Sequence, residues 1–290
     1  MAMKDGLRRD LRTIRWSAWL GWQMESNWTN PLLFLVYSIV KPVFGTFILV
    51  FMYVIILGDV ATDPVLFSYM YVGNAFYMFV AQVMFGVAYV VQEDRERFKT
   101  LKQVYIAPIS FFLYVIGRAL SKMAVTALAV VITLVFGVVA LDVAVDLAQT
   151  AWLMFALGLL IGLACICTIG VALAGVTFLT ARHSSGINEG IAGLFYLFCG
   201  VVYPITVLPQ WAQSIGLAIP ITYWLELMRR TLVPSMDFSE MSELGGYSDL
   251  SILLLLTVTS MAFLLVSIGI FKYADHLARK KGKLDMNSTY

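Results

Sequence analysis

Long apolar runs separated by short polar segments set the pattern of this sequence. Six of these runs are long enough to cross a membrane, and they lie at about 32–57, 66–91, 111–140, 149–180, 188–207 and 250–272. A helix needs about 20 apolar residues to cross roughly 30 Å of hydrocarbon. Because backbone polar groups in lipid must be satisfied within the segment, and the runs are too continuous for barrel strands, each is predicted to be a helix.

The composition supports a membrane protein over a soluble one. The chain has 290 residues, of which 60% are hydrophobic and 13% charged. A soluble domain cannot bury that much apolar surface. We therefore expect a single transmembrane domain over residues 1–290, of the all-α membrane class.

The basic residues determine the predicted orientation. All 20 Lys and Arg residues except Lys41, Arg229 and Arg230 fall on one side of the six predicted spans. The loops 58–65 and 141–148, on the other side, contain none. By the positive-inside rule we expect a multi-pass protein of the plasma membrane with both termini, including a tail at 273–290, in the cytoplasm.

Residues 7–28 form an amphipathic stretch before the first span. Apolar residues recur at helical spacing at Leu7, Leu11, Ile14 and Ala18. The stretch also holds a set of arginine and tryptophan residues, namely Arg8, Arg12, Arg15, Trp16, Trp19, Trp22 and Trp28. This pattern predicts an interfacial helix in the headgroup region. Two interpretations stay open, a membrane-surface anchor and a lateral gate for a membrane-borne substrate.

Small residues in the fourth run predict close helix packing. Gly158 and Gly162 form a G-x-x-x-G pair, and Gly170 and Ala174 repeat the spacing. Such pairs let helix backbones approach closely. The sequence leaves open whether the contact lies within one subunit or across a dimer.

The sequence offers no catalytic constellation. It contains no G-x-x-x-x-G-K-[ST], no H-E-x-x-H and no G-x-S-x-G, so we expect neither an enzyme nor a bound cofactor or metal. Cys165, Cys167 and Cys199 lie in apolar runs and are expected to be core residues. Lys41 and Glu189 are ionisable residues within spans, and whether they line a path is left open.

A charged insert at 93–107 separates the second and third spans. Phe98, Leu101 and Tyr105 fall at helical spacing within it, and Pro108 prevents the helix from continuing. A short amphipathic helix exposed to the cytoplasm is therefore predicted. It is interpreted either as a solvated connector or as a docking element for a soluble partner.

The stretch from Glu96 to Ser110 resembles the E-R-x-x-G-T-L-E-x-L-x-x-x-P-x-S-like segment of type-2 ABC exporter permeases. The matching positions are Glu96, Arg97, Thr100, Leu101, Pro108 and Ser110. In that family the segment is the coupling helix that docks on a separate ATPase subunit. The resemblance implies ATPase-coupling roles for Glu96, Arg97, Phe98, Thr100, Leu101, Tyr105 and Pro108. Lys99 stands where the family usually has Gly, and Lys102 where it often has Glu, which indicates a more acidic partner surface.

A second block, from Gly200 to Arg230, resembles the family pattern G-x-x-x-P-x-x-x-L-P-x-W followed by P-x-T-Y and E-x-x-R. The matching positions are Pro204, Leu208, Pro209, Trp211, Pro220, Thr222, Tyr223, Glu226 and Arg229. Three prolines cannot lie in one straight helix. The fifth span is therefore expected to break into short re-entrant or interfacial helices over 204–230.

Glu226 and Arg229 are three residues apart and are predicted to pair on one helix face. Two interpretations of this segment stay open. One is a structural ion pair with surface aromatics. The other is an outer gate formed by Pro204, Pro209, Trp211, Pro220, Tyr223, Glu226 and Arg229.

Both blocks together imply the transmembrane subunit of an ATP-driven exporter. The implied partners are a second permease, identical or homologous, and two ATPase subunits that carry ATP and Mg²⁺, with no nucleic acid. The drug-export branch is favoured, with a hydrophobic or amphiphilic small molecule as substrate. The alternatives are an exporter of a lipid or lipid-linked glycan and, from another class, an ATP-independent six-span secondary transporter or channel.

Overall fold

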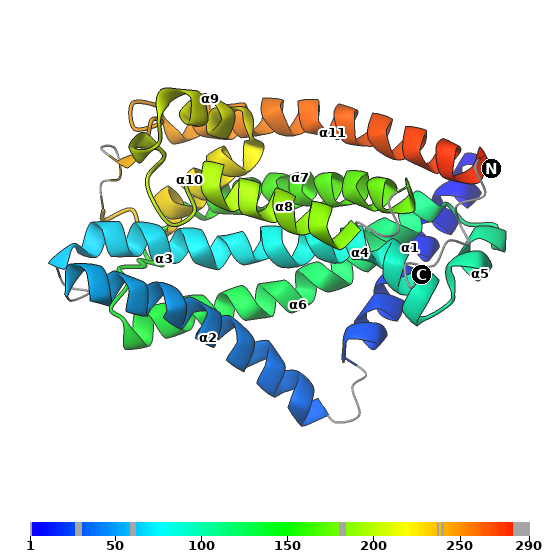
Figure 1. Cartoon of the computed structure of the whole chain (residues 1–290), viewed down its shortest axis with the longest axis horizontal. Coiled ribbons are helices and arrows are strands. Elements are labelled where there is room, and N and C mark those ends of the chain that lie inside the picture. The colour runs from blue at the N-terminus through cyan, green and yellow to red at the C-terminus, as the bar shows by residue number, and fades with distance from the viewer. Residues whose placement is uncertain are drawn as a thin grey trace.

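A computed structural model of the chain describes residues 2–26, 31–58, 62–179, 184–236, 238 and 241–280. Most of its long helices lie side by side along one axis (Figure 1). The α-helices are α1 (Ala2–Ser26), α2 (Pro31–Leu57), α3 (Pro64–Phe79), α4 (Phe85–Gln92), α5 (Leu101–Ile106), α6 (Phe111–Ala140), α7 (Trp152–Leu179), α8 (Ser184–Phe198), α9 (Gln210–Ala218), α10 (Pro220–Leu232) and α11 (Asp249–Lys280). Two π-helical segments, η2 (Val80–Met84) and η3 (Glu93–Arg97), and a 3₁₀ turn, η4 (Ile205–Val207), complete the order.

The central element is one continuous helical path from Pro64 to Arg97, made of α3, η2, α4 and η3. Its start is well defined, because the Asp63 carboxylate accepts the Leu66 N–H at 2.9 Å and proline occupies the first turn. Side chains along it are fully buried, among them Tyr71, Val80 and Val87, each 0% exposed. This helix therefore forms the middle of the hydrophobic core.

Four helices are long and apolar enough to cross a membrane, and they span Pro64–Arg97, Phe111–Ala140, Trp152–Thr177 and Asp249–Leu277. They correspond to the second, third, fourth and sixth predicted runs, which identifies a membrane protein. The first run is helical as α2, although several of its side chains, Lys41 among them, lie outside the described residues. The six-span total stays a prediction.

The fifth predicted span is shorter than expected. Its helix, α8, has 15 residues and ends at Phe198 rather than near residue 207. Gly200 follows with a φ of 65°, a left-handed conformation that ends a helix and favours glycine. The chain therefore breaks before it reaches Pro204.

The small residues of α7 pack within the subunit. A Cβ on Gly162 would lie 2.1 Å from the Trp224 indole, and one on Gly158 would lie 2.5 Å from Leu227. Both neighbours belong to α10. Gly158 and Gly162 therefore make their close contacts within one subunit, which answers for this pair whether the packing lies within a subunit or across a dimer.

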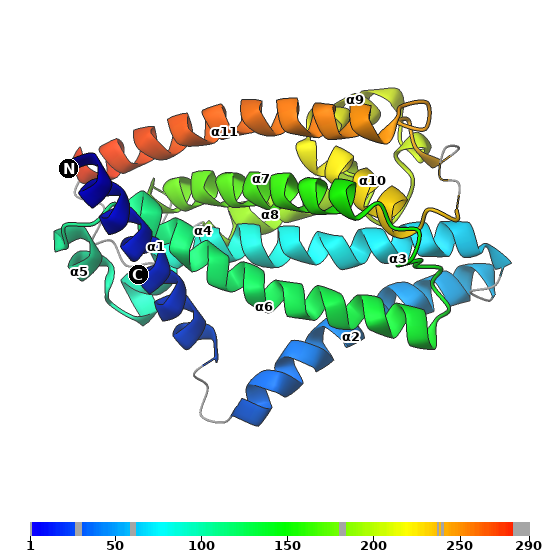
Figure 2. The ribbon, with the colours of Figure 1, turned by 180° about the vertical axis from the view of Figure 1, so that it is seen from behind.

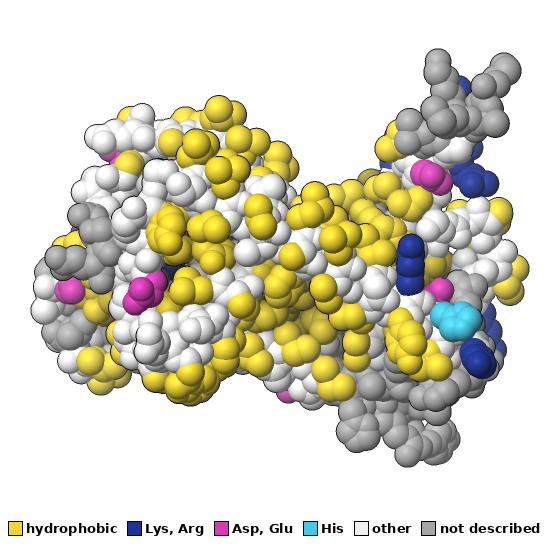
Figure 3. Space-filling model, turned by 90° about the horizontal axis from the view of Figure 1, so that it is seen from above, with side chains coloured by type: hydrophobic (Ala, Val, Ile, Leu, Met, Phe, Trp, Pro, Cys, Tyr) yellow, Lys and Arg dark blue, Asp and Glu magenta, His cyan; other side chains and the backbone are white. Residues whose placement is uncertain are grey.

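Helix α1 crosses α6 at the end of the molecule that also carries α5 (Figure 2). A Cβ on Gly117 of α6 would lie 2.5 Å from the Ser17 side chain and 2.6 Å from the Ile14 carbonyl oxygen. The helices α9 and α10 lie toward the opposite end. Figure 3 shows Lys and Arg side chains gathered toward the end with α1 and α5, and hydrophobic side chains across much of the same face.

Candidate functional site

The charged insert is not one helix, as the sequence predicted over 93–107. Its first part, Glu93–Arg97, continues the central helix as the π-helical turn η3. The path then reverses at Lys99, which has a φ of 55°, and α5 begins at Leu101. The break is stabilised by backbone hydrogen bonds, because Phe98 N–H donates to the Glu93 carbonyl at 2.9 Å and Thr100 N–H to that of Asp94 at 2.8 Å.

Position 99 has a physical preference for glycine. A φ of 55° places the residue in the left-handed region, which costs a residue with a Cβ roughly 1–2 kcal/mol. This explains why the resembling family usually has Gly there. Lys99 therefore marks a strained turn, and the interpretation that it reflects the partner's charge is not needed to explain the position.

Helix α5 is attached to the bundle by the residues that were predicted to face the partner. Leu101 is only 3% exposed and belongs to the chain's own core. The Tyr105 hydroxyl donates to Asp275 of α11 at 2.9 Å, and its ring stacks on Phe111 at 4.8 Å. Two residues of the predicted apolar stripe, Leu101 and Tyr105, therefore contact the bundle, whereas the third, Phe98, is half-buried beside Arg97.

Ile106 is the exposed apolar residue of this helix, at 84%, and the sequence analysis missed it. The signal was present, because a residue five positions after Leu101 lies well around the helix from it at 3.6 residues per turn. The exposed tip of α5 also includes Lys102, Gln103 and the following Pro108. These residues, rather than Leu101, form the exposed surface of α5.

The remaining predicted coupling residues lie around the reversal. The Glu96 carboxylate accepts from Arg95 at 3.3 Å and from Gln92 at 3.4 Å. Arg97 is exposed, with its guanidinium 5.3 Å from the centre of the Phe98 ring. Thr100 precedes α5, and its Oγ1 is buried without a hydrogen-bond partner among the described residues.

A buried ionic cluster joins η3 to α6. Arg118 donates from Nη1 to Asp94 Oδ1 at 3.2 Å and from Nη2 to Glu93 Oε2 at 3.1 Å. The Tyr114 hydroxyl donates to the second Asp94 oxygen at 2.8 Å. Asp94 is 0% exposed and Arg118 is 1% exposed. Removing one member of such a cluster leaves a buried charge unpaired, so the cluster holds the end of the central helix firmly against α6.

The sequence pattern does not predict this cluster. It predicts Glu93 and Asp94 within a helix exposed to the cytoplasm, and it counts Arg118 only among the cytoplasmic positive charges. The available signal was that Arg118 lies within a long apolar helix, where a charge needs a partner. Its partners are distant in sequence, and only the fold brings them together.

At the opposite end, Arg229 of α10 holds the break after α8. Its Nε donates to the Tyr69 carbonyl at 3.0 Å, and its Nη2 donates to those of Gly200 at 2.7 Å and Val201 at 3.1 Å. The guanidinium also lies 3.7 Å from the centre of the Tyr69 ring. The positive charge beside the Gly200 and Val201 carbonyls compensates the C-terminal end of α8.

The predicted Glu226–Arg229 pair is wrong. Glu226 instead accepts from Arg230 Nε at 2.9 Å, one helical turn further on. Arg230 also donates to the carbonyls of Leu244 and Tyr247. Both i+3 and i+4 spacings permit an ion pair on a helix. Arg230 rather than Arg229 pairs with Glu226 because α10 is buried, and its burial turns Arg229 toward α3 and the end of α8.

The three prolines begin helical segments. Pro204 precedes η4, Pro209 precedes α9, and Pro220 occupies the first turn of α10. These positions suit proline, because the first N–H groups of a helix have no intrahelical partner. The structure therefore contains two short helices in this region, α9 (Gln210–Ala218) and α10 (Pro220–Leu232).

The aromatic residues of the predicted gate separate into two groups. Trp224 is 1% exposed and packs edge-on against Phe76, and Tyr223 is 7% exposed. Trp211 of α9 is 64% exposed. Only α9 is therefore a surface element, whereas α10 is part of the core. Glu189 is exposed on α8.

A protein-family model described as "ABC-2 type transporter" matches residues 14–233. The match runs from within α1 to the end of α10, and includes both the α5 turn and the Arg229 site. Comparison with curated protein sequences gives no match. Since the family model covers well over half of the chain, the protein belongs to the ABC-2 type transporter family, as a membrane-spanning permease component of an ABC transporter.

Proposed function

We propose that this permease exports a hydrophobic or amphiphilic small molecule from the cytoplasm or inner leaflet, driven by a separate ATPase subunit. Family membership supports the permease role. The observation that carries the coupling part is the α5 turn, where Ile106 is 84% exposed on a helix that Leu101 and Tyr105 fix to the bundle. An exposed apolar tip on a rigid support suits a docking contact.

The coupling route is argued from the contacts of η3. Closure of two ATPase subunits on ATP and Mg²⁺ would push on α5. The push would reach the central helix through the reversal at Lys99, and α6 through Arg118 and its carboxylate partners. Because the cluster is buried and hydrogen-bonded, movement of η3 would carry α6 with it.

We further propose that two permease copies line the path and that α9 forms the outer gate. Trp211 is the most exposed large apolar residue of α9, and Arg229 holds the chain that leads to α9 through the Gly200 carbonyl. This revises the gate hypothesis, since the buried Glu226 and Arg229 do not form its closing pair. An ATP-independent transporter is disfavoured by the family match.

The test replaces Ile106 by Asp in the full-length permease, co-expressed with the P-loop ATPase that co-purifies with the unsubstituted permease. A charge in a desolvated contact is costly, so Ile106→Asp should abolish co-purification or reduce it at least tenfold. The matched control is Val207→Asp, which is 74% exposed near α9 at the other end of the molecule. Unchanged co-purification by Ile106→Asp, or equal loss by both variants, would contradict the docking assignment.

A further inference from the structure

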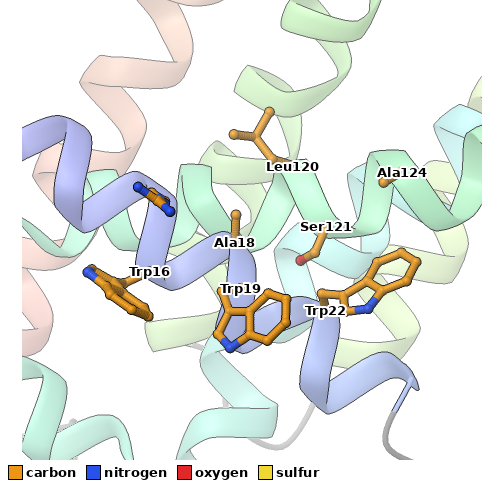
Figure 4. Close-up of a pocket in the computed structure, with 8 residues that line it drawn as sticks. Trp16, Ala18, Trp19, Trp22, Leu120, Ser121 and Ala124 are labelled. Atoms are coloured by element: carbon orange, nitrogen blue, oxygen red, sulfur yellow. The ribbon is translucent and has the colours of Figure 1, made fainter.

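A groove runs between α1 and α6 near the end of the molecule that carries α5. It has a volume of about 770 Å³ and is lined by Arg15, Trp16, Ala18, Trp19, Trp22, Leu120, Ser121 and Ala124. Figure 4 shows the three indoles in a row along α1, with the α6 residues beside them. The indoles of Trp16 and Trp19 are 60% and 56% exposed. The groove falls in the range of roughly 300–1,000 Å³ that is typical of small-molecule sites.

The exposed stripe of α1 that borders the groove changes in character along the helix. Arg8, Arg12 and Arg15 are followed at helical spacing by Trp19 and Trp22, and all five side chains are exposed. Positions separated by four, three, four and three residues lie on one helix face. The stripe is therefore cationic in its first half and aromatic in its second half, and Arg15 lies at the boundary.

The arginines of this stripe have no acidic partner among the described residues, whereas neighbouring cations of α6 do. Lys122 pairs with Glu25, and Arg118 pairs with Asp94 and Glu93. No ion pair joins Arg8, Arg12 or Arg15 to a described carboxylate. Their charge is therefore available to an anion from outside the chain.

We propose that the groove binds one anionic phospholipid. Its phosphate is held by Arg12 and Arg15, and an acyl chain runs along Trp19 and Trp22 toward Leu120. The order of charge and ring along α1 matches the order of head and tail in such a lipid. Basic residues near a membrane surface attract anionic lipids. Indole rings suit the boundary between headgroup and chain.

A lipid in the groove would affect the coupling site by stabilising the helices that support η3. Its α6 wall contains Ser121, which is three residues from Arg118 and donates to the Arg118 carbonyl at 2.7 Å. Its α1 wall crosses α6 at Gly117 with almost no free space. A lipid that bridges the two helices stabilises this crossing, and with it the support of η3.

The binding test uses the purified full-length permease and native mass spectrometry during titration with phosphatidylglycerol or phosphatidylcholine. Arg15→Gln should weaken phosphatidylglycerol binding about five- to tenfold, given about 1 kcal/mol per basic residue. The matched control is Arg9→Gln, which removes the same charge from an exposed position of α1 that does not line the groove. If Arg15→Gln and Arg9→Gln weakened phosphatidylglycerol binding equally, the loss would reflect net charge alone. That result would overturn the proposed binding site.

A second variant tests the groove without changing its charge. Ala124 lines the groove and is exposed, so Ala124→Trp should fill the space and lower phosphatidylglycerol retention to a similar extent. Retention of phosphatidylcholine equal to that of phosphatidylglycerol would mean ordinary bilayer contact. Efficient Trp19→Cys cross-linking between copies would mean that a second copy covers the groove. Either outcome overturns the proposal, and because no ATPase is needed, such a failure leaves the export proposal standing.

Discussion

Lys99 occupies a backbone conformation in which a side chain is a disadvantage, with a φ of 55° at the turn before α5. Its side chain is exposed, so it makes no contribution to the core that would offset the strain. The turn is maintained by the hydrogen bonds of the neighbouring residues Phe98 and Thr100. Lys99 is therefore a site where the backbone, and not the side chain, limits stability.

The first prediction is that Lys99→Gly stabilises the permease. Removing the Cβ relieves roughly 1–2 kcal/mol of left-handed strain, and the added flexibility of glycine in the unfolded chain costs about 0.5–1 kcal/mol. The apparent Tm in detergent should rise by about 2 °C. As a control, Gln103→Gly, at an exposed helical position in α5, should lower it. A fall in Tm for Lys99→Gly would show that the turn is not strained as described.

Arg229 gives a second prediction at this scale, because one buried guanidinium donates to the Gly200 and Val201 carbonyls beyond the end of α8. Arg229→Ala removes this donor at about 1–3 kcal/mol for each carbonyl left unpaired, so a large loss of apparent Tm and of monodisperse protein is expected. Arg229→Lys should restore little, since an ammonium group cannot reproduce the planar fork. The exposed Arg97→Ala serves as the control. A wild-type Tm for Arg229→Ala would show that these bonds do not hold the break after α8.

Among the helices, the apolar runs predicted the second, third, fourth and sixth spans well, because hydrophobic length alone determines them. The prolines predict a break at Pro204, but α8 ends earlier, at Phe198, because Gly200 turns the chain first. The sequence also could not predict which arginine pairs with Glu226, because both i+3 and i+4 spacings allow an ion pair. The burial of α10 decides between them, since it turns Arg229 away and leaves Arg230 as the partner. Local spacing predicts helices, but tertiary packing selects which face is covered.

A third prediction concerns the crossing of α1 and α6. Gly117→Ala would place a Cβ 2.6 Å from the Ile14 carbonyl oxygen, a backbone atom that cannot rotate away. We expect a loss of about 1–3 kcal/mol, and release of α1 to limited proteolysis. Gly269→Ala in α11, where a Cβ meets nothing within 4 Å, is the matched control and should be neutral or slightly stabilising. Unaltered protease resistance of Gly117→Ala would show that the crossing tolerates separation.

Over the whole molecule, the two functional candidates lie at opposite ends of one long bundle. The α5 turn and the basic residues of α1 are at one end, and α9 and the Arg229 site are toward the other (Figure 1). The central helix from Pro64 to Arg97 connects them, since its early part contacts Arg229 through Tyr69 and its last turn contacts Arg118. A displacement of η3 thus has a direct structural route to the support of the outer segment.

This arrangement makes the orientation of the bundle the most informative property to test. The fourth prediction is that Gln103→Cys in α5 reacts with a membrane-impermeant maleimide only after cells are permeabilised, whereas Gln210→Cys at the start of α9 reacts in intact cells. Both side chains are exposed, so burial does not limit either reaction. The background replaces Cys165, Cys167 and Cys199 by Ala.

The expected labelling follows from the positive-inside rule. The helix α1 and the region of α5 carry most of the described arginines, while the α9 end has only Arg229 and Arg230. Labelling of residue 103 in intact cells would place α5 outside, where no cytoplasmic ATPase can reach it, and the docking role of Ile106 would fall with the orientation.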